Sequence, residues 1–357
     1  MIYDSNKFVI QGSSLVSYIG NEPEVRIPDG VIEIKSFAFN NCENLERVFV
    51  PASVLVIKRY AFIDCVKLQC INIDPLNKRY SSFDGIVYSK DEKNLVRVPA
   101  AKREVEIRSG TKHIGRGAFS SCQIESIAIP DTVVTIGDCA FRGCSQLSKL
   151  IIPDNVQVIG DSAFLGCTKL TEIRLSTVLE IIHAHLFSKC SSLTQVSIPQ
   201  YVKEIELSAF NECSNLVEIV VDKSNERYTS SNGMLFEKHH NGTLTLLCVP
   251  QALPGEISLS ERVTDIEYYA FFRCSQITKV IIPASVRPPA YTKWALLGCT
   301  SLHIENIIVP KGFIKNKGIV FFEDSFDSEP CITVESHNCD KLQKQVLNDL
   351  IESLIQQ

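Results

Sequence analysis

Hydrophobic and polar positions recur along this chain with a period of about 23 residues, from near residue 24 to residue 310. The unit is roughly I-P-x-x-V-x-x-I-x-x-x-A-F-x-x-C-x-x-L-x-x-I-x. Within it, L-x-x-I-x-I-P alternates apolar and polar side chains, which predicts a strand with one buried face that proline ends. The V-x-x-I stretch predicts a second short apolar segment, and A-F-x-x-C predicts a turn with apolar groups on one side.

Nine copies of the unit align on a cysteine, and these residues are Cys42, Cys65, Cys122, Cys144, Cys167, Cys190, Cys213, Cys274 and Cys299. Their successive spacings are 23, 57, 22, 23, 23, 23, 61 and 25 residues, so two copies are followed by insertions of about 35 residues. One unit has too little core to fold alone and must stack on its neighbours. Stacked strands about 4.8 Å apart would form a parallel ladder along one face of a solenoid.

The phrase IP-x-x-V-x-x-IG-x-x-AF-x-x-C-x-x-L resembles the BspA-like leucine-rich repeat family over about residues 24–310. The insertions, near 74–110 and 222–260, share N-x-x-Y, a D/N-G turn and two apolar runs, which predict a hairpin in each. The resemblance implies an α/β leucine-rich-repeat solenoid with a parallel β ladder on one face and short strands or turns on the other. We expect two hairpin-bearing insertions and a C-terminal helix in addition.

Three regions are expected along the chain. Residues 1–24 read as an N-terminal cap hairpin, 25–310 as the solenoid, and 311–357 as a C-terminal cap with an amphipathic helix. The helix is expected over 339–357, where apolar residues recur at i+4 spacing from Leu342 to Leu354. It would either close the open end of the solenoid or mediate self-association.

Charge and composition exclude several classes of partner. The net charge of −5 offers no electrostatic basis for binding nucleic acid, and no apolar run approaches the roughly 18 residues of a membrane span. We therefore expect neither nucleic-acid binding nor membrane insertion. No secretory signal is visible, which with many thiols indicates a cytoplasmic protein, unless the chain is the trimmed form of a secreted or cell-surface protein.

The repeated cysteines suggest architecture more than chemistry. They would form a column with one thiol per rung, which does not converge on a tetrahedral zinc site, and C-x₂-C is absent from the sequence. We expect buried thiols, with disulfides between rungs as the alternative. His183 and His185 flank a turn, and no motif of a hydrolase, metalloprotease or nucleotide-binding enzyme occurs. The sequence therefore predicts no enzyme, no cofactor and no metal.

Strand alternation predicts which side chains of the ladder face outward. The candidate ligand-facing residues are Arg47, Phe49, Lys149, Ile151, Glu172, Arg174, Gln195, Glu218, Val220, Lys279 and Ile281. The charged members could simply pair across strands. The apolar members either form a protein-binding patch or are covered by the insertions.

These observations favour a non-enzymatic protein-binding module that uses its strand-lined face. The family resemblance implies adhesion to a protein ligand, and an intracellular interaction scaffold is the nearest variant. The alternative is a structural subunit that self-associates through residues 339–357.

Overall fold

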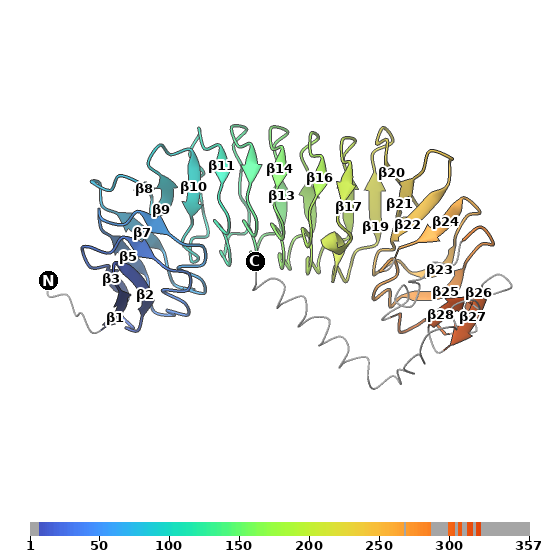
Figure 1. The fold of residues 1–357 in the computed structure, drawn as a ribbon, viewed down its shortest axis with the longest axis horizontal. Coiled ribbons are helices and arrows are strands. Elements are labelled where there is room, and N and C mark those ends of the chain that lie inside the picture. Colours follow the sequence, from blue (N-terminus) through green and yellow to red (C-terminus); the bar gives the residue numbers. More distant parts are fainter. Residues whose placement is uncertain are drawn as a thin grey trace.

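The computed structural model describes residues 7–267, 269–286, 299–303, 306–308, 313–316 and 319–322. In Figure 1 the repeats stack side by side as rungs of one curved array. Within the described residues the regular elements are β-strands and the 3₁₀ helix η2 (Leu207–Phe210). None of these residues forms a helix long and apolar enough to cross a membrane.

The predicted α/β class is therefore wrong for the described residues, which form a β-solenoid. The A-F-x-x-C segment turns too tightly for an α-helix, because residues on either side of the phenylalanine adopt left-handed backbone. In one rung these are Ser162, with φ of 55°, and Gly166, with φ of 75°. The helix expected over 339–357, and the self-association assigned to it, lie outside the described residues.

The L-x-x-I-x-I segments form the longer strands, as predicted, and their array is called here the long ladder. Its parallel groups are β3 (Glu24–Arg26), β5 (Arg47–Val50) and β7 (Cys70–Ile73); β13 (Lys149–Ile151) and β15 (Glu172–Arg174); β17 (Gln195–Ile198) and β19 (Glu218–Val221); and β23 (Gly255–Ser258), β25 (Ile277–Ile281) and β26 (Ile307–Ile308). Equivalent repeat positions pair with each other, so Lys149 lies opposite Glu172.

The V-x-x-I segments form two-residue strands on the other face, called here the short ladder. They are β4 (Glu33–Ile34), β6 (Val56–Ile57), β11 (His113–Ile114), β12 (Thr135–Ile136), β14 (Val158–Ile159), β16 (Ile181–Ile182) and β18 (Glu204–Ile205), with β24 (Val263–Ile266) as a longer equivalent. At the N-terminal end, β1 (Phe8–Gln11) and β2 (Ser14–Tyr18) form an antiparallel hairpin, and β2 pairs in parallel with β4.

Each insertion forms a three-stranded antiparallel meander. The first contains β8 (Tyr80–Phe83), β9 (Ile86–Ser89) and β10 (Asn94–Arg97), and the second contains β20 (Tyr228–Ser231), β21 (Met234–Lys238) and β22 (Leu244–Cys248). The third strand then pairs in parallel with the short ladder, β10 with β11 and β22 with β24. The insertions therefore occupy places in the stack. A further antiparallel pair, β27 (Phe313–Asn316) and β28 (Ile319–Phe322), follows the last repeat.

The N-x-x-Y motif joins each insertion to the rung before it. Asn77 is fully buried, and its side-chain amide donates to the carbonyls of Pro51 (3.1 Å) and Val54 (2.8 Å). The Tyr80 hydroxyl accepts a bond from the Ile57 N–H at 3.1 Å. In the second insertion Asn225 and Tyr228 make the same bonds to Pro199, Val202 and Ile205. The motif thus supplies hydrogen-bond partners to backbone groups of the preceding rung, which a further regular repeat would otherwise supply.

Phenylalanine and cysteine form two parallel columns in the core. The rings of Phe119 and Phe141 stack at 4.7 Å, and stacking continues through Phe164, Phe187 and Phe210. Six of the repeat cysteines donate their S–H to the carbonyl of the phenylalanine in the preceding unit: Cys65 to Phe39 (2.9 Å), Cys144 to Phe119 (3.0 Å), Cys167 to Phe141 (3.2 Å), Cys190 to Phe164 (3.2 Å), Cys213 to Phe187 (3.0 Å) and Cys299 to Phe271 (3.1 Å). Cys122 and Cys274 follow the insertions and donate to Val98 (3.5 Å) and Val249 (3.3 Å). The thiol is therefore a hydrogen-bond donor as well as a small apolar group.

The long ladder is interrupted where the repeat changes length. The rung that ends in Ile127–Ile129 has no strand, and its segment from Cys122 to Ile124 is one residue shorter than the equivalent segment from Cys144 to Leu147. β13 therefore has no strand partner on this side. β15 does not pair with β17 either, so β13 and β15 form an isolated two-stranded sheet.

Candidate functional site

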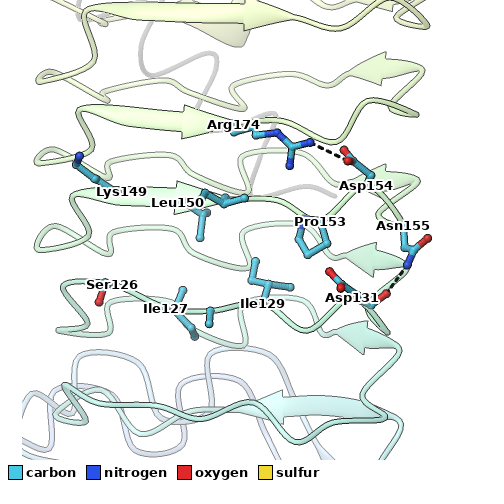
Figure 2. A pocket seen from close by; sticks show the side chains of 12 residues that line it. Ser126, Ile127, Ile129, Asp131, Lys149, Leu150, Pro153, Asp154, Asn155 and Arg174 are labelled. Carbon is cyan, nitrogen blue, oxygen red and sulfur yellow. Dashed lines mark hydrogen bonds and ion pairs between the residues drawn. The ribbon is translucent and has the colours of Figure 1, made fainter.

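The interruption beside β13 leaves a hollow of about 650 Å³ on the long ladder. Figure 2 shows it between the rung of Ser126–Ile129 and the strand of Lys149–Ile151. Arg174, from β15, and residues of the two proline-containing turns, among them Asp131, Pro153, Asp154 and Asn155, complete the lining. The hollow is thus formed by three successive rungs.

Strand alternation places the side chains of β13. Leu150 points into the core and is 2% exposed, whereas Lys149 and Ile151 point outward. Ile151 is 62% exposed, which is high for a large aliphatic side chain. The strand therefore presents one aliphatic group with a cation two residues before it.

The rung opposite β13 leaves backbone groups available. The N–H groups of Ile127, Ala128 and Ile129 make no hydrogen bond to another backbone group in the described part of the chain. A backbone bond still joins the two rungs at one end, from the Ser148 N–H to the Glu125 carbonyl at 3.1 Å, and the Asn155 side chain donates to the Asp131 carbonyl at 2.7 Å at the other (Figure 2). Polar backbone groups without protein partners need water or a ligand, so the hollow combines apolar side chains with main-chain hydrogen-bonding capacity.

Ion pairs organise the charged rim. Lys149 Nζ lies 2.9 Å from Glu172 Oε2, and Arg174 Nη2 lies 2.7 Å from Asp154 Oδ2. The Thr177 N–H donates to Asp154 Oδ1 at 3.0 Å. This backbone donor, followed by Arg174, lowers the pKa of the Asp154 carboxyl. The cross-strand pairing considered from the sequence is therefore present, and the rim carries both signs of charge.

The predicted ligand-facing residues do not converge on one place. Three of them, Lys149, Ile151 and Arg174, line the hollow, and Glu172 reaches it through its ion pair. The remaining exposed members lie along the other ladder groups and are Arg47, Gln195 and Glu218. The half-buried members are Phe49, Val220, Lys279 and Ile281.

Some of these side chains have partners within the chain. The guanidinium of Arg26 lies 4.9 Å from the ring centre of Phe49. Gln195 donates to Glu218 at 2.9 Å, and Lys279 pairs with Glu256 at 2.9 Å. These contacts make the corresponding positions part of the surface packing of the ladder.

The second insertion covers part of the apolar set. Its β20–β21 hairpin lies against β19, where the Ile219 N–H donates to Gly233 O at 2.9 Å and the Val221 N–H to Ser230 Oγ at 3.0 Å. Val220, between them, is half-buried. Ile151 lies far from either insertion in sequence and keeps its exposure. An insertion therefore partly covers Val220 and leaves Ile151 exposed.

The candidate ligand-facing residues listed from the sequence leave out Ser126–Ile129, although strand alternation predicts that Ser126 and Ala128 face outward. A signal that sets this rung apart is the spacing of 22 residues between Cys122 and Cys144, one fewer than the usual 23.

The buried thiols are unreactive. Burial raises the pKa of Cys122 and of Cys190 to about 12, so these groups stay protonated at neutral pH. All described cysteines are free. Seven of the nine repeat cysteines are buried, whereas Cys42 and Cys299, near the ends of the array, are half-buried.

A cluster of two carboxylates and one imidazole lies on the face of the short ladder. Asp161, His183 and Glu206 come from three successive rungs, and their ligand atoms all lie within 4.8 Å of one another. Partial desolvation raises the pKa of Asp161, and the charges of Asp138 and Glu206 add to this while His183 opposes it. These three residues could hold a metal ion.

Comparison with known proteins gives the family. No curated protein matches the chain. Among solved structures, a leucine-rich cell surface protein from Faecalibacterium prausnitzii is 23% identical with a TM-score of 0.43, and the match covers 86% of this chain and 94% of that one. A leucine-rich repeat protein from Eubacterium ventriosum is 20% identical with a TM-score of 0.47, covering 86% and 92%. The pneumococcal vaccine antigen PcpA is 20% identical with a TM-score of 0.46, covering 82% and 69%.

The family model described as the BspA type leucine rich repeat region matches in six copies, over residues 12–90, 112–239 and 254–350. These ranges make up most of the chain and include both ladders, the N-terminal part of each insertion and the candidate site. The protein therefore belongs to the BspA-type leucine-rich repeat family.

Proposed function

We propose that this protein is a non-enzymatic binding module that holds a protein ligand on its long ladder, at the hollow beside β13. The observation that carries the proposal is Ile151, 62% exposed at the edge of a hollow of about 650 Å³. Contiguous apolar surface bordered by charge is typical of protein-binding sites.

The hollow suits an extended segment of a partner. Its aliphatic lining from Ile127, Ile129 and Ile151 would accept an apolar side chain of the ligand. The N–H groups of the 127–129 rung would bond to the ligand main chain, as in recognition by strand addition. Lys149 and Arg174 at the rim would pair with ligand carboxylates, and exposed ion pairs are weak enough to exchange partners.

A pull-down from a native lysate tests the proposal with two matched variants. Ile151→Asp places a charge in the hollow, and we expect it to lower the yield of the captured partner at least tenfold, as for a central contact of an interface. Leu76→Asp makes the same change at an aliphatic side chain that is 78% exposed, in the first insertion, and should leave the yield unchanged.

Reversing the charges of Lys149, Glu172 and Arg174 together provides a second arm. We expect weaker capture with a changed salt dependence, because the rim would then repel the ligand. Circular dichroism of each variant establishes that the solenoid is folded. Retention of the same partner at undiminished yield by both Ile151→Asp and the charge-reversed variant would show that the hollow is not the binding site.

A further inference from the structure

The rung of residues 172–190 departs from the repeat at several positions. Leu175-Ser176 stands where neighbouring rungs have Ile-Pro, and His183 stands where the two preceding rungs have Gly137 and Gly160. At Gly160 an added Cβ would lie 2.5 Å from the Asp138 nitrogen, whereas other rungs carry Lys35, Lys58 or Glu206 at the equivalent position. His183 and Glu206 therefore give two successive rungs a polar side chain at this position.

The short ladder is also interrupted at this rung. β14 and β16 are not paired, and a hollow of about 510 Å³ lies between them. Val158, Leu179, Glu180 and His183 are among its lining residues. A ligand bound at His183 would therefore link two rungs whose strands, β14 and β16, are not hydrogen-bonded to each other.

Stacking brings two carboxylates to the imidazole of His183. The Nδ1 atom lies 3.4 Å from Asp161 Oδ1, in the preceding rung, and 3.2 Å from Glu206 Oε1, in the following rung. Zinc bonds of about 2.1 Å in tetrahedral geometry place neighbouring ligand atoms about 3.4 Å apart. Two of the three distances between the ligand atoms, from Nδ1 to each carboxylate oxygen, therefore already match the separation expected around a bound zinc ion.

The charges around the cluster favour a cation. Among the described residues, neither Asp161 nor Glu206 forms an ion pair with a lysine or arginine, whereas the neighbouring Asp138 is paired with Arg116 at 2.7 Å and Glu212 with Arg273 at 3.4 Å. Arg116 and Arg273 thus neutralise neighbouring carboxylates. Asp161 and Glu206 face the imidazole of His183 instead. Two carboxylates against one imidazole leave a net negative site.

We propose that Asp161, His183 and Glu206 bind a divalent transition-metal ion, with zinc as the best match to one imidazole and two carboxylates. Three protein ligands leave one coordination position for water or for a side chain of a partner. The metal joins three successive rungs at the break in the short ladder. This site is separate from the one on the long ladder, and either proposal can fail without the other.

Isothermal titration of the reduced full-length protein with zinc chloride tests the proposal. The native chain should bind zinc, and His183→Gln and Asp161→Asn should each weaken that binding at least tenfold. The matched control is His185→Gln, because His185 lies two residues away, is half-buried and contacts Ser188 Oγ at 3.2 Å. This control should bind zinc as the native chain does.

Cobalt(II) distinguishes the cluster from adventitious binding at exposed thiols. Coordination by nitrogen and oxygen should give weak visible absorption without the intense near-ultraviolet charge-transfer band that a thiolate produces. The melting temperature should also rise with zinc for the native chain and not for His183→Gln, because a ligand stabilises the state that binds it. Equal zinc binding by the native chain and His183→Gln, or a thiolate band alone, would overturn the proposal and leave the three residues as an ion-paired group.

Discussion

The group β3–β5–β7 and the pair β13–β15 are built from the same repeat, yet their edges differ. In the N-terminal group three consecutive strands pair in register, and Arg26 covers the ring of Phe49. In the middle of the molecule, β13 and β15 pair only with each other, and Ile151 lies uncovered beside the hollow. The same family repeat therefore gives a paired edge in one region and an open edge in another, and the open edge lies beside the rung with the shortened turn.

We expect the phenylalanine column in the core to contribute equally to stability in the two regions. Phe39 and Phe141 are fully buried and stack on neighbouring rings at 5.0 Å (Phe39 on Phe62) and 4.7 Å (Phe141 on Phe119). We expect Phe39→Ala and Phe141→Ala each to lower the free energy of unfolding by about 3–5 kcal/mol, because each leaves a cavity in the column. Urea denaturation measures both. A much smaller loss for Phe141→Ala would mean that the opening of the ladder also loosens the core.

The cysteine column gives the next largest effect. In Cys65→Ala and Cys144→Ala the carbonyls of Phe39 and Phe119 lose their thiol donors, at a cost of about 1–3 kcal/mol each. Cys42→Ala is the control, because its half-buried thiol contacts Asn40 O at a long 4.0 Å and the Cys65 thiol, donates to no phenylalanine carbonyl, and should cost less. Equal losses for Cys42→Ala and Cys144→Ala would show that the thiol acts through volume alone.

Lengthening the turn after Gln123 tests directly whether its length causes the break in the long ladder. A serine inserted after Gln123 restores the usual spacing between Cys122 and the next apolar residue, so we expect the rung of Ile127–Ile129 to form a strand that pairs with β13. Each backbone hydrogen bond gained should add about 1 kcal/mol to stability. Hydrogen exchange of the Ile129 amide would slow, and capture of the partner would fall. Unchanged exchange with a folded protein would assign the break to something other than turn length.

The smallest effect concerns the ion pair on β13. A double-mutant cycle with Lys149→Ala and Glu172→Ala should give a coupling energy below about 1 kcal/mol, because both side chains are more than two-thirds exposed. The matched pair in the N-terminal group is Arg47 with Glu24, at 3.6 Å. Similar small values in both regions are expected from thermal unfolding in low salt. A coupling above 2 kcal/mol for Lys149 would make this pair a structural element and not an exchangeable part of a binding rim.

Several features of the fold were predictable because they depend on local periodicity. Ile151 and Lys149 face outward because alternation along a strand is set by the backbone itself. The cysteine column and the hairpins of the insertions followed from spacing and turn residues. The same reasoning was wrong about α/β class, since the A-F-x-x-C segment contains two left-handed residues that sequence does not display.

By itself, the sequence determined the period, the inward and outward faces of each strand, and the family, because these depend on residue order within about 23 positions. Only the tertiary structure decided which rungs pair and which separate, since rungs with the same 23-residue spacing are paired at β13–β15 and unpaired at β15–β17. It also decided that Asp161, His183 and Glu206 meet. These residues are 22 and 23 positions apart, and only stacking of the rungs brings their side chains within reach of one ion.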